Sequence, residues 1–149
     1  MKRCLRLISL LLLFCLNPCQ AEEKTETYHL YMQVRGREFT GIWVMNESSD
    51  AGIVGTVINE FGVKAFDFTY NGRKTQLHHV NAFLDKWYIT RILKKDLTFI
   101  ITNMQDRKDH AEKKRQISFL DSGEVVVVNS RYRIQYNFTP MSEYDETDE

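Results

Sequence analysis

The carboxylates that are the strongest candidates for a chemical role in this 149-residue chain are Glu60 and Asp67. Asp67 interrupts an aromatic run, between Phe66 and Phe68. A carboxylate in such a strand lies either at a sheet edge or in a hydrogen bond beneath a covering helix, because an unpaired buried charge is costly. The pattern favours a structural role for Asp67 over a catalytic one. A hydrolase with Glu60 or Asp67 as its acid is the least favoured hypothesis.

The histidines do not form a recognisable metal or catalytic pattern. His78 and His79 are neighbours at the end of an expected strand, so their side chains should point to opposite faces of the sheet. His110 stands in the charge-rich stretch QDRKDHAEKKR and is expected to be solvated. No phosphate-binding loop, HExxH or GxSxG motif is present in the sequence. The sequence therefore predicts a non-enzymatic protein with neither a cofactor nor a metal.

One helix is expected, over Phe83 to Leu97. Its apolar residues form two neighbouring rows at helical spacing, which are Leu84, Tyr88 and Ile92, and then Ile89 and Leu93. Asp85 near the start and Lys94 and Lys95 near the end suit the helix dipole. Consecutive helix positions point in different directions, so Asp85, Lys86 and Trp87 should not converge on a substrate. The helix is predicted to cover a sheet with little of its surface exposed, with Trp87 on its flank.

The rest of the chain reads as short strands separated by turn signals such as Asn71-Gly72 and Ser122-Gly123. RYRIQYNF alternates apolar and polar residues, whereas EFTGIWVM, GIVGTVI, LTFII and VVVV carry apolar residues on both faces. Strands that are apolar on both faces indicate that another sheet or the helix covers the second face. The predicted fold is mainly β (α+β), a curved antiparallel sheet or incomplete barrel of about nine strands with one helix on its concave face.

The first 21 residues have the pattern of a secretory signal peptide. A basic start is followed by an apolar stretch over residues 7–16 and by Cys19-Gln20-Ala21, which predicts cleavage after Ala21 and a periplasmic or secreted protein. Lipid attachment at Cys19, which would make a membrane-anchored lipoprotein, is the alternative. Residues 22–141 are expected to form one β-rich domain, and residues 142–149, SEYDETDE, an acidic disordered tail.

The charge pattern bears on the partners. The chain has 20 basic and 20 acidic residues. The only charged residues in the signal peptide are basic, so its loss leaves an excess of acidic residues, and the net charge does not favour a nucleic acid as a partner. Basic side chains recur in clusters, among them Lys94, Lys95, Lys113, Lys114 and Arg115. In an exported protein these clusters would contact anionic lipid headgroups or an acidic partner, or else they are solvated loops beside strands.

The stretch Gly41 to Asn71, GIWVMNESSDAGIVGTVINEFGVKAFDFTYN, resembles the strand succession of LolA/LolB-like bacterial lipoprotein carriers. The resemblance lies in a glycine-initiated strand, a turn, a strand that ends in the apolar-Gly corner Phe61-Gly62, and a following strand. It implies an incomplete barrel that is closed by helices and holds acyl chains inside. The ligand-lining residues that it suggests are Trp43, Phe66, Phe68, Trp87 and Tyr88.

Two functional hypotheses remain. The first is a bacterial envelope protein that binds a lipid, an acylated protein or another apolar ligand in a curved-sheet cavity. The alternative is a packed β-domain that acts as a protein-interaction or structural module of the envelope. An open cavity would favour the first hypothesis and a packed interior the second.

Overall fold

The computed structural model describes residues 24–48 and 52–141. The expected signal peptide with Cys19 and the expected acidic tail at 142–149 lie outside these residues. Within the described part, the chain forms nine strands and one helix.

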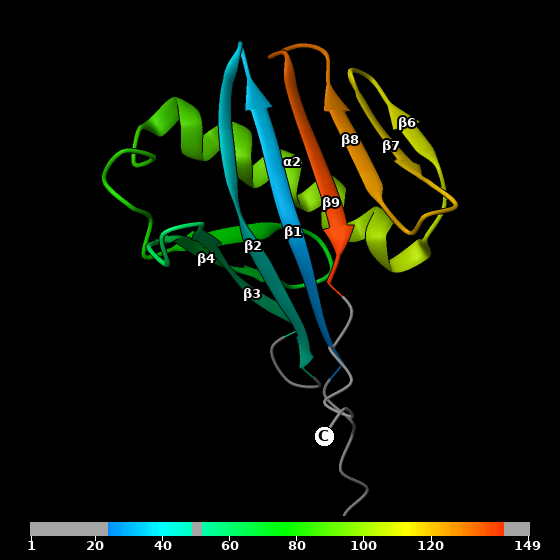
Figure 1. The fold of residues 1–149 in the computed structure, drawn as a ribbon, viewed down its shortest axis with the longest axis horizontal. Coiled ribbons are helices and arrows are strands. Elements are labelled where there is room, and N and C mark those ends of the chain that lie inside the picture. The colour runs from blue at the N-terminus through cyan, green and yellow to red at the C-terminus, as the bar shows by residue number, and fades with distance from the viewer. Residues whose placement is uncertain (1–23, 49–51, 142–149) are drawn as a thin grey trace, which may run out of the picture.

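All nine strands belong to one antiparallel sheet (Figure 1). They are β1 (Thr25–Val34), β2 (Arg37–Ser48), β3 (Gly52–Asn59), β4 (Lys64–Tyr70), β5 (Thr75–His78), β6 (His110–Glu112), β7 (Arg115–Phe119), β8 (Val125–Asn129) and β9 (Ile134–Pro140). Their order is β5-β4-β3-β2-β1-β9-β8-β7-β6, so two meanders meet where β1 pairs with β9. The sheet does not close into a barrel, because β5 and β6 remain at its edges. This architecture confirms the predicted fold class.

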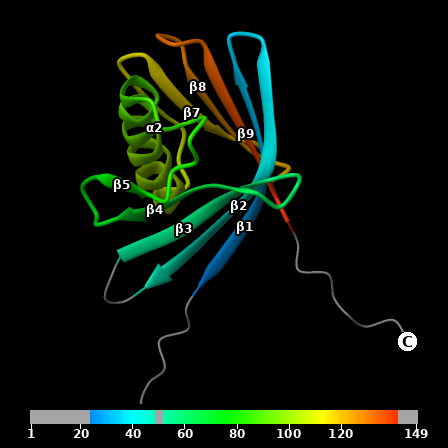
Figure 2. The ribbon, with the colours of Figure 1, turned by 90° about the vertical axis from the view of Figure 1, so that its left-hand side faces the viewer.

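The helix, α2 (Trp87–Asp106), connects the two edge strands and lies on the concave face of the sheet (Figure 2). It begins four residues later than expected, because residues 82–84 form a turn in which the Asn81 carbonyl accepts the amides of Leu84 and Asp85. It also ends nine residues later than expected. There Arg107 adopts the left-handed conformation, and its amide donates to the Asn103 carbonyl at 3.0 Å.

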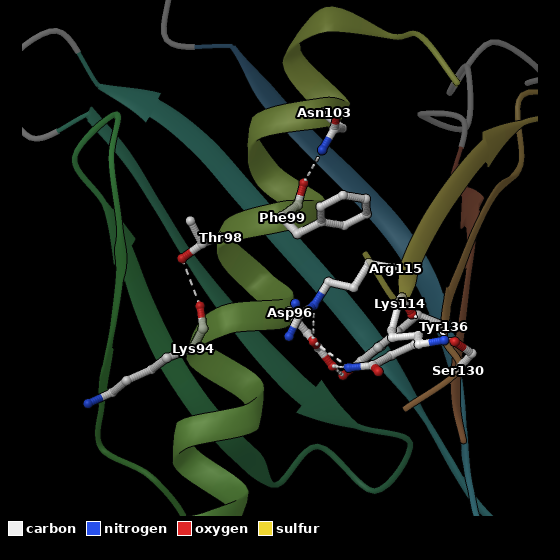
Figure 3. Close-up of polar contacts among 10 residues, drawn as sticks. Lys94, Asp96, Thr98, Phe99, Asn103, Lys114, Arg115, Ser130 and Tyr136 are labelled. Atoms are coloured by element: carbon white, nitrogen blue, oxygen red, sulfur yellow. Dashed lines mark hydrogen bonds and ion pairs between the residues drawn. The ribbon is translucent and has the colours of Figure 1, made fainter. Parts of the chain in front are cut away.

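The prediction of a strand over LTFII was wrong, because Leu97–Ile101 is the middle of α2. A five-residue apolar run fits either a buried strand or a helix. Continuation to Met104 supplies the helical spacing, and the polar residues bond within the helix. The Thr98 hydroxyl donates to the Lys94 carbonyl and the Asn103 amide to the Phe99 carbonyl, both at 2.7 Å (Figure 3).

The core lies between α2 and the concave face. Trp43 packs on Phe68 with ring centroids 4.5 Å apart and meets Phe138 edge-on at 5.3 Å. Ile100 and Ile101 of the helix are fully buried in the same core. The alternation predicted for β9 is observed, with Ile134, Tyr136 and Phe138 on the buried face.

The outer face of the sheet is not covered by a second layer within the described residues. Apolar side chains on that face are only half-buried, as for Val44 and Val54, or exposed, as for Val128. The expectation that apolar residues on both faces require a cover on both was therefore wrong. Cross-strand neighbours on the outer face contact one another and so bury one another in part.

Candidate functional site

The most deeply buried charged group of the described residues is Asp96, on the sheet-facing side of α2 and 1% exposed. Its Oδ1 accepts hydrogen bonds from Arg115 Nε at 2.6 Å and from Asn129 Nδ2 at 2.8 Å. Its Oδ2 accepts from Tyr136 Oη at 2.9 Å and again from Asn129 Nδ2 at 3.0 Å. The three partners come from β7, β8 and β9, so one carboxylate holds the helix to three adjacent strands (Figure 3).

This Asp96 network is structural in character. Every partner donates, and both carboxylate oxygens are occupied, so no lone pair is left open for a substrate proton. Burial and the neighbouring Asp96 charge hold the pKa of Tyr136 well above its usual value, which keeps the phenol protonated as a donor. No role was predicted for Asp96 from the sequence. A signal was present, because Asp96 lies three residues after Leu93 and four before Ile100, on the apolar side of the helix.

The residues suggested by the carrier resemblance separate into two groups. Trp43, Phe66 and Phe68 are buried in the core beneath α2. Trp87 and Tyr88 are 74% and 51% exposed at the start of the helix, where their rings meet edge-on at 6.0 Å. The expectation that Tyr88 lies in the buried row of the helix was therefore wrong, because the buried side of α2 runs through its later turns, from Leu93 to Met104.

One hollow opens on the concave side, at the carboxyl end of α2, with a volume of about 220 Å³. Met45, Ile53 and Met104 line its apolar part, and five polar residues, Lys24, Glu26, Glu47, Gln105 and Arg107, line the rest. Its size falls below the roughly 300–1,000 Å³ of small-molecule pockets.

The charges at this hollow largely compensate one another. Glu26 pairs with Lys24 at 2.6 Å and with Arg107 at 3.5 Å, and it accepts the Tyr28 hydroxyl at 2.9 Å. Burial alone raises the pKa of Glu26, but the hydrogen bonds from Lys24 and Tyr28 outweigh burial and leave this pKa below its usual value. Glu26 is therefore ionised at neutral pH.

A second hollow of about 360 Å³ is a groove on the outer face over β2 to β5. There the structure brings together residues that the sequence singled out, since Asp67 Oδ2 lies 2.8 Å from His79 Nδ1 and 2.9 Å from Lys64 Nζ. His78 Nε2 lies 3.1 Å from the Thr69 hydroxyl. Burial alone raises the pKa of Asp67. The hydrogen bonds from Lys64, Thr56 and His79 outweigh burial and leave this pKa below its usual value. Such a carboxylate is ionised at neutral pH and is a poor general acid.

Glu60, the other carboxylate singled out from the sequence, and His110 do not belong to either hollow. Glu60 accepts a hydrogen bond from the Thr40 hydroxyl at 2.8 Å in an exposed position. His110 packs beside Phe99, with ring centroids 6.0 Å apart. Across residues 24–48 and 52–141, no three His, Cys, Asp or Glu side chains are placed as metal ligands.

The most unusual surface lies at the amino-terminal end of α2. We call it the aromatic–basic surface, and it comprises Phe83, Lys86, Trp87, Tyr88, Arg91, Lys94 and Lys95. All seven residues are exposed, and the first turn of the helix contains no acidic residue. At about 100° per residue, the five helical members from Trp87 to Lys95 fall within about 120° of the helix circumference, opposite the buried side.

Further along α2 the same side contacts the edge of the sheet through two threonines. Thr98 Oγ1 lies 3.1 Å from Thr75 Oγ1 of β5, and Thr102 Oγ1 lies 2.7 Å from the Tyr70 hydroxyl of β4. The later turns still expose Thr102, Gln105 and Asp106 on this side, so the start of the helix is distinguished by its aromatic and basic side chains. Figure 1 shows this start beyond the long strands β1 and β2.

The other basic residues expected to meet a membrane do not join this surface. Arg115 turns inward to Asp96, and Lys113 and Lys114 lie in the turn between β6 and β7. Figure 3 shows Lys94 and Lys114 on opposite sides of α2. The basic clusters of the sequence thus form two separate surfaces.

The chain matches no family model, no curated protein and no solved structure with which it was compared. The resemblance to LolA/LolB-like carriers therefore stays a prediction.

Proposed function

We propose that this protein is a non-enzymatic docking module, in which a packed β-domain presents the aromatic–basic surface to a partner. The observation that carries the proposal is the exposure of Phe83, Trp87 and Tyr88, at 53%, 74% and 51%, within six residues of one another. Isolated exposed apolar residues are ordinary, whereas neighbouring large ones mark interaction sites.

The support beneath this surface favours the same function. The Asp96 network and the buried Leu97, Ile100 and Ile101 hold α2 to the sheet. A surface on a firmly held helix loses little conformational entropy when it binds, so the partner need not order it.

A carrier of acyl chains is the other candidate. A ligand that lies between α2 and the rings of Trp43 and Phe68 would have to displace the helix. The side chains on both sides of that space are packed together, and each is only 0–1% exposed. The concave hollow beside Met45 and Met104 is the feature that favours this candidate, as the open end of a cavity that would enlarge if α2 moved.

Photo-crosslinking in the native host tests the docking module. A photoreactive phenylalanine analogue at position 87 should form an adduct. The same analogue at Leu120, which is 45% exposed before the β7–β8 turn, should not. Adducts of equal yield at both positions, or at neither, would contradict the proposal.

A further inference from the structure

We infer that the partner of the aromatic–basic surface is an anionic membrane surface. This inference rests on the proposed docking function and names its partner. The start of α2 would lie in the plane of the membrane, with the rings of Phe83, Trp87 and Tyr88 at the boundary between headgroups and acyl chains. Lys86, Arg91, Lys94 and Lys95 would lie among the headgroups.

The aromatic residues suit such a boundary. Trp and Tyr have an apolar ring and one polar group, and they concentrate at membrane–water interfaces. Trp87 and Tyr88 project from the same exposed turn, and neither of the two hollows described above is lined by them. Protruding rings of this kind can insert at the boundary between headgroups and acyl chains without a pocket in this chain.

The charges favour a membrane over a protein. Four basic residues fall between Lys86 and Lys95 without an acidic one, in a chain whose basic and acidic residues are equal in number. None of the four has an ion-pair partner in residues 24–48 and 52–141. Lysine is depleted in protein–protein interfaces, but anionic headgroups attract it. Three of the four basic residues are lysines.

The geometry matches a helix that lies on a membrane and does not cross it. The described residues contain no helix that is both long and apolar enough to span a bilayer. The aromatic and basic side chains share one side of α2, while the opposite side is buried against the sheet. Beyond the first turns the same side carries Thr98, Thr102, Gln105 and the acidic Asp106, so the contact is limited to the start of the helix.

Trp87 itself reports the contact. The chain has two tryptophans, and Trp43 is 1% exposed whereas Trp87 is 74% exposed. In the exported protein with Trp43→Phe, Trp87 is the sole tryptophan. Its emission should shift to the blue when vesicles of phosphatidylglycerol and phosphatidylcholine are added. Phosphatidylcholine vesicles alone should leave it nearly unchanged, and added salt should weaken the shift.

Charge reversal supplies the matched pair of variants. K94E/K95E should weaken partitioning onto the anionic vesicles by about thirtyfold or more, since each lysine near such a surface contributes about fivefold. K113E/K114E makes the same change of net charge at the other basic surface and should have little effect. Trp87→Ser, a single exposed substitution, should weaken partitioning without a charge change, and its denaturant midpoint checks that the fold is kept.

The outcomes separate the inference from the docking function. An unchanged Trp87 emission with anionic vesicles would overturn the membrane inference, as would equal losses in K94E/K95E and K113E/K114E. If position 87 then still crosslinks to a protein in the host, the docking module stands with a protein partner. If position 87 forms no adduct either, both proposals fail. A lipid anchor elsewhere on the chain would not reproduce the dependence on Lys94 and Lys95.

Discussion

At the residue scale, Asp96 joins α2 to three strands through a carboxylate that is 1% exposed. A buried ion pair adds little net stability by itself, but removal of one partner leaves the others unsatisfied. Asp96→Ala would leave Arg115, Asn129 and Tyr136 without their acceptor. It should lower the free energy of unfolding by about 3–5 kcal/mol.

The matched control is Asp85→Ala, which removes an exposed carboxylate just before the same helix. It should change the free energy of unfolding by less than about 0.5 kcal/mol. Urea denaturation of both variants makes the comparison. A small loss for Asp96→Ala would show that the network does not hold the helix.

Two tyrosines make stability depend on alkaline pH. Burial, followed by the charge of Glu26, raises the pKa of Tyr28 to about 12 from a usual value of 10.0. Burial and the charge of Asp96 also hold the pKa of Tyr136 well above its usual value. The unfolded chain loses these protons near pH 10, whereas the folded chain keeps them. The contribution of the two tyrosines to the free energy of unfolding is therefore complete below pH 10 and falls as the pH rises from about 10 to 12.

The measurement is urea unfolding at a series of alkaline pH values. Tyr28→Phe should reduce the fall in stability, because phenylalanine has no proton to release. Tyr132→Phe, at a half-buried position, is the control and should leave the fall unchanged. Equal slopes for wild type and Tyr28→Phe would contradict the assignment.

The two tryptophans should differ in access to solvent. Acrylamide should quench Trp87, seen alone in Trp43→Phe, and should leave Trp43, seen alone in Trp87→Phe, nearly unquenched. The Trp43 emission should also lie at the shorter wavelength, because its ring is packed between Phe68 and Phe138. Similar quenching of both would mean that α2 does not cover Trp43 in solution.

At the element scale, α2 is stabilised by its later turns. Ile100→Ala should cost about 2–5 kcal/mol, because the side chain is 0% exposed and its removal leaves a cavity. Ile92, in the earlier half, is only partly buried, so Ile92→Ala should cost less. Lys94→Ala, on the exposed side, should cost at most about 0.5 kcal/mol. Thermal unfolding of the three variants tests this order, and equal losses would place the buried side of the helix elsewhere.

At the scale of the whole molecule, the docking module and the carrier differ in whether α2 must leave the sheet. The hydroxyl oxygens of Thr75 on β5 and Thr98 on α2 are 3.1 Å apart, which suits a disulfide in Thr75→Cys/Thr98→Cys. A docking module needs no helix movement, so the crosslinked protein should bind anionic vesicles as well as the reduced protein does.

The same variant tests the carrier with a fluorescent fatty acid. A carrier in its reduced form would be stabilised by about 2.7 kcal/mol at a hundredfold excess of the probe over its dissociation constant. The crosslinked form would not respond. The single variants Thr75→Cys and Thr98→Cys control for the new thiols. We expect no stabilisation in either form, and stabilisation of the reduced form alone would favour the carrier.

Much of the architecture could be predicted because its signals are local. Turn residues such as Asn71-Gly72, and the alternation in RYRIQYNF, depend on neighbours within a few positions, so they indicated about nine antiparallel strands. The helix was expected near the right place, but its limits were not. The run LTFII fits both the spacing of a strand and that of a helix, and only the continuation to Met104 against the sheet made it helical.

The sequence by itself determined a β-rich domain with one helix, because alternation, turn chemistry and helical spacing are properties of adjacent residues. Only the tertiary structure decided which side of that helix is buried. It buried Asp96 among donors from three strands that are remote in sequence, and it left Trp87 and Tyr88 exposed. It also joined Asp67 to His79 across an outer groove. Exposure and partners depend on which distant segments arrive beside a residue, and no short window of sequence contains that information.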